Sequence, residues 1–141
     1  MIGLDTNVLV RYITRDDEQQ WQKAAELIEN EQQCFITNIV LCELVWVLRG
    51  KPYQFSKDEI LKTLDVMMQS AALEYENRTA VYQALQRSKQ GRGDFSDYLI
   101  GAIARQLGCQ QTATFDKKLR GDKGFQLIGE QSKKFPFPLA P

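Results

Sequence analysis

The chain has 141 residues, which is enough for one domain of ordinary size. Hydrophobic residues make up 43% of it and charged residues 26%, a composition typical of a globular protein rather than a disordered one. The 18 Lys and Arg balance the 18 Asp and Glu, so binding of a polyanion would depend on local basic patches. No apolar run approaches the roughly 18 residues that span a membrane, and no leader-like segment opens the chain, so we expect a cytoplasmic protein.

Histidine is absent, and the three cysteines, Cys34, Cys42 and Cys109, are widely spaced. The lack of histidine excludes Ser-His-Asp triads, Cys-His dyads and His-ligated zinc. Without a Cys-x-x-Cys pair, we expect free thiols instead of structural zinc or a disulfide framework. Any chemistry must therefore use carboxylates, hydroxyls, lysines or a hard metal ion.

Short apolar segments alternate along the chain with segments of helical periodicity. Thr6 and Asn7 offer capping side chains after the first strand, and Ser56 with Glu59 forms a capping-box pattern. Gly108 is placed to end the helix before it. The expected strands are residues 1–5, 34–36, 72–75, 112–115 and 125–128, and the expected helices are residues 8–13, 16–31, 39–48, 57–68, 78–89 and 94–107.

This alternation predicts parallel strands joined by right-handed crossovers, with helices on both faces of the sheet. We therefore expect a three-layer α/β/α sandwich around a central parallel sheet of about five short strands. Residues 1–130 are expected to form this domain. Residues 131–141, which include Phe135 and Phe137, are expected to form an extended C-terminal tail.

Acidic residues follow the expected strands at their carboxyl ends, where open parallel sheets bind ligands. Asp5 ends the first strand, and Asp116 follows the strand 112–115. Asp94 and Asp97 begin the helix that leads into that strand, and their spacing of three places them on one helix face. Three of these acids also have a structural alternative, with Asp94 as an N-cap, Asp97 at the third helical position and Asp116 as a turn or cap residue.

Glu43 is the only acid in the apolar run of residues 39–48, which predicts a buried carboxylate. A buried charge needs a partner, because leaving it unpaired costs several kcal/mol or more. A divalent cation shared with the other acids would provide one. An ion pair with Arg49 or Arg11 is the alternative.

Four or five carboxylates without an imidazole or thiolate cluster indicate Mg²⁺, or Mn²⁺ in its place, rather than zinc. Such an ion supports phosphodiester hydrolysis by lowering the pKa of a bound water and neutralising charge on the phosphate. Arg92, Lys117 and Lys118 lie near these acids in sequence and are candidates for binding RNA phosphates. Solvated surface charge is the alternative for these basic residues.

Four segments resemble the PIN-domain family, and within it the VapC-like toxins. They are Leu4-Asp5-Thr6-Asn7-Val8-Leu9, Glu43 within residues 37–48, Asp94-Phe95-Ser96-Asp97-Tyr98 with the helix after it, and Thr114-Phe115-Asp116. The resemblance covers about residues 1–130. It implies a Mg²⁺-dependent endoribonuclease that acts as the toxin of a toxin–antitoxin pair.

The same resemblance implies the roles of individual residues. Asp5, Glu43, Asp97 and Asp116 would be the catalytic and metal-binding acids, with Asp94 as an additional ligand. Thr6, Asn7 and Thr114 would be auxiliary residues that orient a ligand or water. It further implies a homodimer, a cognate antitoxin that blocks the acidic pocket, and a structured substrate such as tRNA or ribosomal RNA.

Other function classes fit parts of the pattern. A phosphatase with Asp5 as covalent nucleophile would need a second Asp where Asn7 stands. A receiver-type signalling domain would need a phosphate-accepting Asp after a middle strand, and none is evident. A noncatalytic RNA-binding or scaffold protein could share the fold, although all the expected acids are present.

Overall fold

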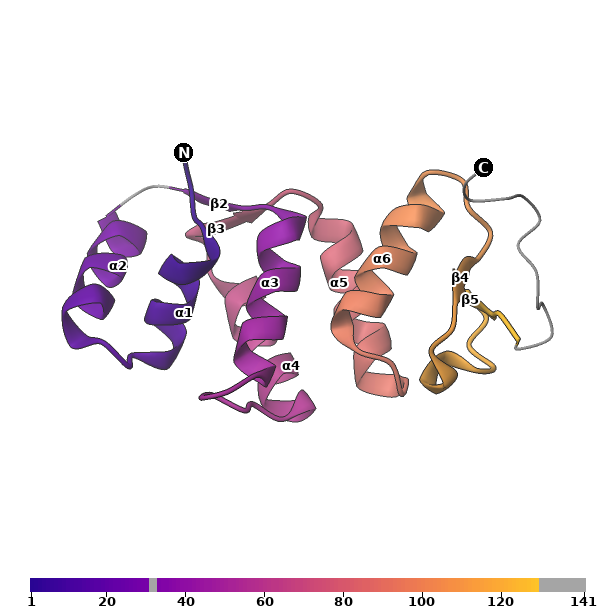
Figure 1. Ribbon diagram of the computed structural model, residues 1–141. Helices are drawn as coiled ribbons and strands as arrows, with labels where there is room; N and C mark the ends of the chain where they lie inside the picture. The colour runs from indigo at the N-terminus through magenta and orange to yellow at the C-terminus, as the bar shows by residue number, and fades with distance from the viewer. Residues whose placement is uncertain (31–32, 130–141) are drawn as a thin grey trace, which may run out of the picture.

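The computed structural model describes residues 1–30 and 33–129, so the expectations for residue 31, for the last residue of the domain 1–130 and for the tail 131–141 lie outside the described residues. Within the described ranges, six α-helices and five short strands alternate (Figure 1). The helices are α1 (Thr6–Thr14), α2 (Glu18–Asn30), α3 (Asn38–Arg49), α4 (Lys57–Gln69), α5 (Arg78–Gln90) and α6 (Phe95–Gln106). The strands are β1 (Ile2–Gly3), β2 (Cys34–Ile36), β3 (Leu73–Tyr75), β4 (Thr112–Thr114) and β5 (Phe125–Leu127), and a 3₁₀ turn, η1, spans Lys117–Leu119.

The strands confirm the expected mixed α/β class, because every pair among the described residues is parallel. They divide into one sheet of order β1-β2-β3 and a second sheet of β4 and β5. β1 has only two residues, which leaves few backbone groups along its free edge for another strand. Among the described residues, the five strands therefore do not form the single central sheet that the sequence pattern predicted.

Local capping interactions explain where several helices begin. Ser56 accepts a hydrogen bond from the Glu59 N–H while Glu59 accepts one from the Ser56 N–H, which confirms the expected capping box of α4. Thr37 caps α3 through the Val40 N–H. At α1 the cap is Asp5 rather than Thr6 or Asn7, so the helix begins one residue earlier than the side-chain types suggested.

The core lies between the first sheet and helices α1, α3, α4 and α5, and it continues to α6 and the second sheet. Tyr98 of α6 packs edge-on against Phe125 of β5, with the ring centroids 5.9 Å apart. Cys34 is buried, Cys42 is half-buried and Cys109 is exposed, and all three are free thiols. Among the described residues, no helix has the length and apolar character needed to cross a membrane.

Helices α3 and α6 pack against each other and run in opposite directions (Figure 1). The C-terminal end of α3 therefore meets the N-terminal end of α6. Asp94 and Asp97 lie at that end of α6, and Glu43 lies in the middle of α3. This arrangement positions the acids described below.

Candidate functional site

Asp5 and Glu43 line one open pocket of about 280 Å³. Asp5 follows β1 and caps α1, where its Oδ1 accepts a 3.1 Å hydrogen bond from the Val8 N–H. Glu43 comes from the middle of α3. The fold thus brings two carboxylates from separate elements to one cavity that is open to solvent. The remaining lining residues are Thr6, Asn7, Val40, Trp46 and Val47.

Thr6 connects the two walls of this pocket. Its hydroxyl donates a 2.8 Å hydrogen bond to Oε1 of Glu43. Because Thr6 belongs to the first turn of α1 and directly follows Asp5, this bond holds the Glu43 carboxylate beside the chain that carries Asp5. Thr6 therefore orients a candidate metal ligand.

The expectation that Glu43 is buried is wrong, because its side chain is exposed. The apolar run that contains it is a helix with two unlike sides. Its buried side consists of Leu41, Leu44, Val45 and Leu48. The alternative of an ion pair between Glu43 and an arginine is also not observed: Arg11 pairs with Asp16, and Arg49 pairs with Asp94.

A second acidic group begins α6. Asp94 occupies the N-cap position, and Oδ2 of Asp97 accepts a 3.0 Å hydrogen bond from the Asp94 N–H. Both side chains are half-buried. The structural roles considered for these two acids are thus present, and the helix N-terminus favours their negative charge.

Asp116 joins this second group from the β4 side. It caps η1 by accepting a 2.9 Å hydrogen bond from the Lys118 N–H, and its own N–H donates to Oγ1 of Thr114 at 3.0 Å. The Lys118 Nζ lies 3.3 Å from Oδ2 of Asp94 and 3.9 Å from Oδ2 of Asp116. One ammonium group therefore lies between two of the expected acids.

Arg49 links the end of α3 to the same group. Its Nη1 lies 2.6 Å from Oδ1 of Asp94. Burial raises the pKa of the Asp94 carboxyl, but the hydrogen bonds and charges of Arg49 and Lys118 outweigh it, and the pKa is lowered overall. Asp94 is therefore charged and held between two cations.

Glu43 of the first acidic group lies on α3, and Asp97 of the second lies on α6. Cys42 and Ser96, the immediate neighbours of Glu43 and Asp97, form a side-chain hydrogen bond between these two helices. Burial raises the pKa of the Cys42 thiol. The hydrogen bond with Ser96 lowers the same pKa by less, so the pKa is raised overall. Within residues 1–30 and 33–129, however, no three acids are close enough together to hold one metal ion.

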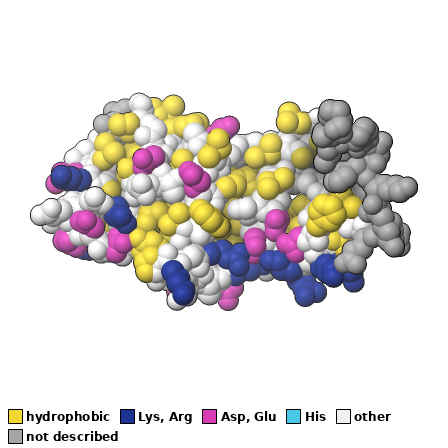
Figure 2. All heavy atoms as spheres, in the orientation of Figure 1, with side chains coloured by type: hydrophobic (Ala, Val, Ile, Leu, Met, Phe, Trp, Pro, Cys, Tyr) yellow, Lys and Arg dark blue, Asp and Glu magenta, His cyan; other side chains and the backbone are white. Residues whose placement is uncertain are grey.

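The expected basic residues lie beside the second acidic group. Arg92 is exposed in the loop before Asp94, and Lys117 and Lys118 are exposed in η1. Figure 2 shows Asp and Glu side chains next to a band of Lys and Arg near the meeting point of α3 and α6. A second hollow of about 350 Å³ is also lined by Asp5 and Asn7, together with Arg11 and Lys23.

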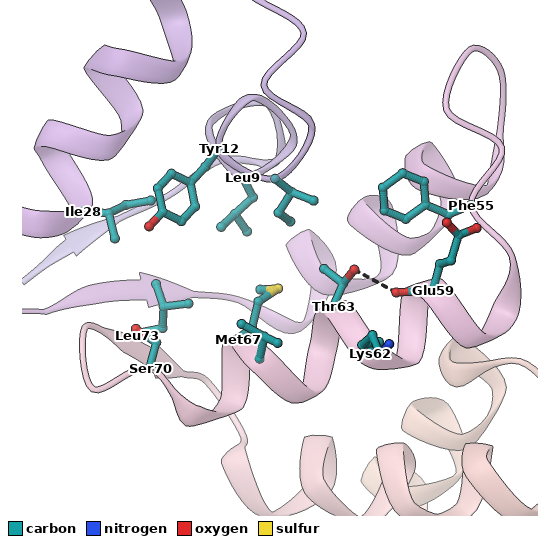
Figure 3. A pocket seen from close by; sticks show the side chains of 12 residues that line it. Leu9, Tyr12, Ile28, Phe55, Glu59, Lys62, Thr63, Met67, Ser70 and Leu73 are labelled. Atoms are coloured by element: carbon teal, nitrogen blue, oxygen red, sulfur yellow. Dashed lines mark hydrogen bonds between the residues drawn. The ribbon is translucent and has the colours of Figure 1, made fainter. Parts of the chain in front are cut away.

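A larger cavity of about 530 Å³ lies away from the predicted acids (Figure 3). It is formed mainly by apolar side chains of α1, α2, α4 and β3, among them Leu9, Ile28 and Met67. Its one acid, Glu59, accepts the Ser56 N–H in the capping box of α4. This cavity therefore lacks the groups needed for hydrolysis.

Sequence reasoning missed two residues of the site region. Trp46 lines the pocket of Asp5 and Glu43, whereas the sequence pattern placed it only within the apolar run of residues 39–48. Its spacing of three from Glu43 was the available signal, because residues three apart are neighbours on a helix surface. Arg49 had been weighed only as a partner for Glu43.

In a comparison with protein-family models, residues 2–121 match the model described as PIN domain. The matched region contains all of the candidate acids and the helices and strands up to η1. No curated protein and no solved structure matches the chain.

Proposed function

This chain belongs to the PIN-domain family, and we propose that it is a Mg²⁺-dependent endoribonuclease acting as the toxin of a toxin–antitoxin pair. The family is a nuclease fold family whose members generally use divalent metal ions. The choice of Mg²⁺, of RNA and of the VapC-like toxin role goes beyond that match. These finer points rest on the donor set of the site and on the sequence motifs.

The observation that carries the proposal is the shared pocket of Asp5 and Glu43. Both side chains are exposed and reach the pocket from different elements, β1–α1 and α3. No Lys or Arg among the described residues forms an ion pair with either of them. Two neighbouring carboxylates without a basic partner favour binding of a cation.

The residues present fit Mg²⁺ in particular. This ion retains several waters and is commonly bound by one or two carboxylates together with substrate phosphates. Asp5 and Glu43 supply two carboxylates in an open pocket, and the Thr6 hydroxyl orients one of them. When bound, the ion supplies a water of lowered pKa and neutralises charge that develops on the phosphate.

We assign the second acidic group to the same reaction. Asp97 uses Oδ2 for the backbone of Asp94, and no hydrogen bond from the described residues reaches its Oδ1. That oxygen is available to orient a water or accept a proton. Asp116 is oriented by Thr114 and Lys118, and Asp94 by Arg49 and Lys118. Asp94 ranks below Asp97 as a metal ligand because two cations already bind it.

The proposed substrate is RNA, with tRNA or ribosomal RNA as its class. Arg92, Lys117 and Lys118 lie beside the second acidic group, where a phosphate backbone would lie next to the carboxylates. A cognate antitoxin and a homodimer complete the proposal. Both come from the resemblance to VapC-like toxins.

The first experiment is cleavage of labelled total RNA by the purified protein. It is run with Mg²⁺, with excess EDTA, and with the variants Glu43→Gln and Asp97→Asn in Mg²⁺. We expect cleavage by the wild type that EDTA abolishes and that each substitution lowers by at least about 100-fold. The matched control is Asp65→Asn, an acid on α4 that pairs with Lys89 away from both acidic groups and should retain activity.

Different outcomes separate the rival functions. RNA binding without cleavage by the folded, Mg²⁺-supplied wild type would indicate a noncatalytic RNA-binding protein. Release of phosphate from a small phosphomonoester, lost in Asp5→Asn, would indicate an Asp-nucleophile phosphatase.

The toxin role needs a separate test. Expression of the wild type from a tightly controlled promoter should stop growth, and Asp97→Asn should not. Co-expression of the adjacent small reading frame, if it encodes a DNA-binding protein, should restore growth. Normal growth under wild-type expression, with active nuclease in the lysate, would indicate a processing nuclease instead.

A further inference from the structure

Trp46 is a large apolar side chain that the core of the protein does not use. It is 78% exposed, whereas Leu44, Val45 and Leu48 on the other side of α3 are buried. The exposed side of α3 carries Glu43 one turn before Trp46. The ring therefore lies next to a candidate metal ligand.

The same pocket contains Trp46, Asp5 and Glu43. Asn7 also lines it and is exposed, so its amide can donate and accept hydrogen bonds there. One cavity thus contains carboxylates, an amide and the edge or face of an indole ring. This combination suits a ligand that has a phosphate, polar ring edges and a flat aromatic surface.

Resting on the proposed ribonuclease function, we infer that Trp46 stacks on a nucleobase of the RNA next to the phosphate at the acidic pocket. Base stacking on aromatic side chains is a common means of binding single-stranded nucleic acid, because every base has a flat face. The stacked base holds an unpaired stretch of RNA in the pocket.

The pocket favours a nucleotide over an apolar protein surface. A purely apolar protein surface packed on Trp46 would also cover the carboxylates of Asp5 and Glu43 and remove them from water with no cation to compensate their charge. A nucleotide stacks on the ring while its phosphate approaches the carboxylates together with the metal ion. The ligand then satisfies the apolar and the charged parts of the pocket at once.

Arg49 provides a positive charge for the continuing backbone. It follows Trp46 by three residues on α3, and the ion pair with Asp94 orients its guanidinium group. Its side chain is 43% exposed, so it remains accessible to a phosphate. Glu43, Trp46 and Arg49 thus present an acid, a ring and a cation in order along one helix.

The test measures RNA binding without cleavage, using a fluorescein-labelled single-stranded RNA of ten nucleotides in Mg²⁺. Every variant is made in an Asp97→Asn background, which is expected not to cleave and which serves as the wild type at position 46. Loss of one stacked base corresponds to about 1–3 kcal/mol, so Trp46→Ala should weaken binding by about 5- to 150-fold. Trp46→Phe retains an aromatic face and should bind within a few-fold of the wild type. Trp46→Leu, which is apolar but has no ring, should behave like Trp46→Ala.

Ile39→Ala is the matched control, because Ile39 is 72% exposed on the same helix and lies outside the pocket. It should leave RNA affinity unchanged. Circular dichroism and melting temperatures of all four variants establish that they are folded. Since Trp46 is exposed, truncating it should leave the melting temperature close to that of the wild type.

Tryptophan fluorescence reports the stacking directly. The chain has two tryptophans, and Trp21 lies under the guanidinium of Arg15, 3.7 Å from its ring centroid. In Trp21→Phe, Trp46 is the sole emitter, and the RNA should quench it. An RNA of the same length with abasic sites should bind more weakly, and the Trp46→Ala effect should disappear with it.

Unchanged RNA affinity in Trp46→Ala, or equal loss in Ile39→Ala, would overturn the inference. So would a Trp46 emission that changes with protein concentration and not with RNA, because that result indicates an interface between two copies of the chain. These outcomes are independent of the nuclease assay. If the wild type cleaves RNA in Mg²⁺ and Trp46→Ala has the same KM for RNA as the wild type, the stacking role is refuted while the ribonuclease function stands.

Discussion

The hydroxyl of Thr6 lies 2.8 Å from Oε1 of Glu43, across 37 residues of sequence, and it donates a hydrogen bond to that carboxylate. The bond places one wall of the acidic pocket, α1, in a defined position relative to the other, α3. Mutation of a polar residue that orients a metal ligand typically lowers metal affinity by about 10- to 100-fold.

Thr6→Val should therefore weaken Mg²⁺ binding by about 10- to 100-fold, because the substitution keeps the side-chain shape and removes only the hydroxyl. Isothermal titration calorimetry with Mg²⁺ measures the effect without RNA. Thr6→Ser retains the hydroxyl and should bind Mg²⁺ nearly as the wild type does. Equal affinity of the valine variant and the wild type would show that Glu43 needs no orientation by Thr6.

Asp97 combines a capping role with its proposed chemical role, and two substitutions separate them. Asparagine still offers an oxygen to the Asp94 N–H, so the free energy of unfolding of Asp97→Asn should lie within about 0.5 kcal/mol of the wild-type value. RNA cleavage should nevertheless be lost. Asp97→Ala removes the acceptor and should cost about 0.5–2 kcal/mol as well. Urea denaturation measures both. Cleavage retained in Asp97→Asn would leave Asp97 only its capping role.

Asp94 should make stability depend on pH at the acidic end of the range. Its pKa is lowered in the folded protein, so the ionised form is stabilised by Arg49 and Lys118. That contribution, about 0.2–1 kcal/mol, is fully present above the unfolded-state pKa near 4 and is lost as the pH falls through the lower folded-state pKa.

Melting temperatures of the wild type and Asp94→Asn, measured from pH 7 to pH 3, provide the check. The difference between them should be constant down to about pH 5 and should shrink below about pH 4. Lys118→Met, which removes one of the two cations, should reduce the difference. A difference that grows as the pH falls would contradict the assigned ion pairs.

Gly93 lies just before α6, where a larger residue would push against the buried side chains of Leu119 and Tyr98. A Cβ there would lie 2.5 Å from Cδ2 of Leu119 and 3.2 Å from the ring of Tyr98. Gly93→Ala should therefore destabilise the fold by about 1–3 kcal/mol. Gly3→Ala is the control, since a Cβ at Gly3 has no described atom within 4 Å. Equal melting temperatures for the two variants would contradict the packing around Tyr98.

Local interactions explain why much of the fold could be predicted. The capping box of Ser56 and Glu59 and the positive φ of Gly108 after α6 involve residues within a few positions of one another. The same holds for the capping positions of Asp94 and Asp116. Hydrophobic periodicity located all six helices and all five strands of the described residues to within a few residues.

The sequence by itself thus determined the order and type of the elements and the identity of the acids, because these follow from local patterns and side-chain chemistry. Only the tertiary structure decided that Glu43 is exposed, that it is held by Thr6, and that Arg49 binds Asp94. It also decided that the five strands form two sheets. These features depend on which helix faces pack together. That packing is decided by residues far apart in the chain as they bury apolar surface. Because the hydrophobic effect is non-directional, it produces no local residue spacing from which the packing could be predicted.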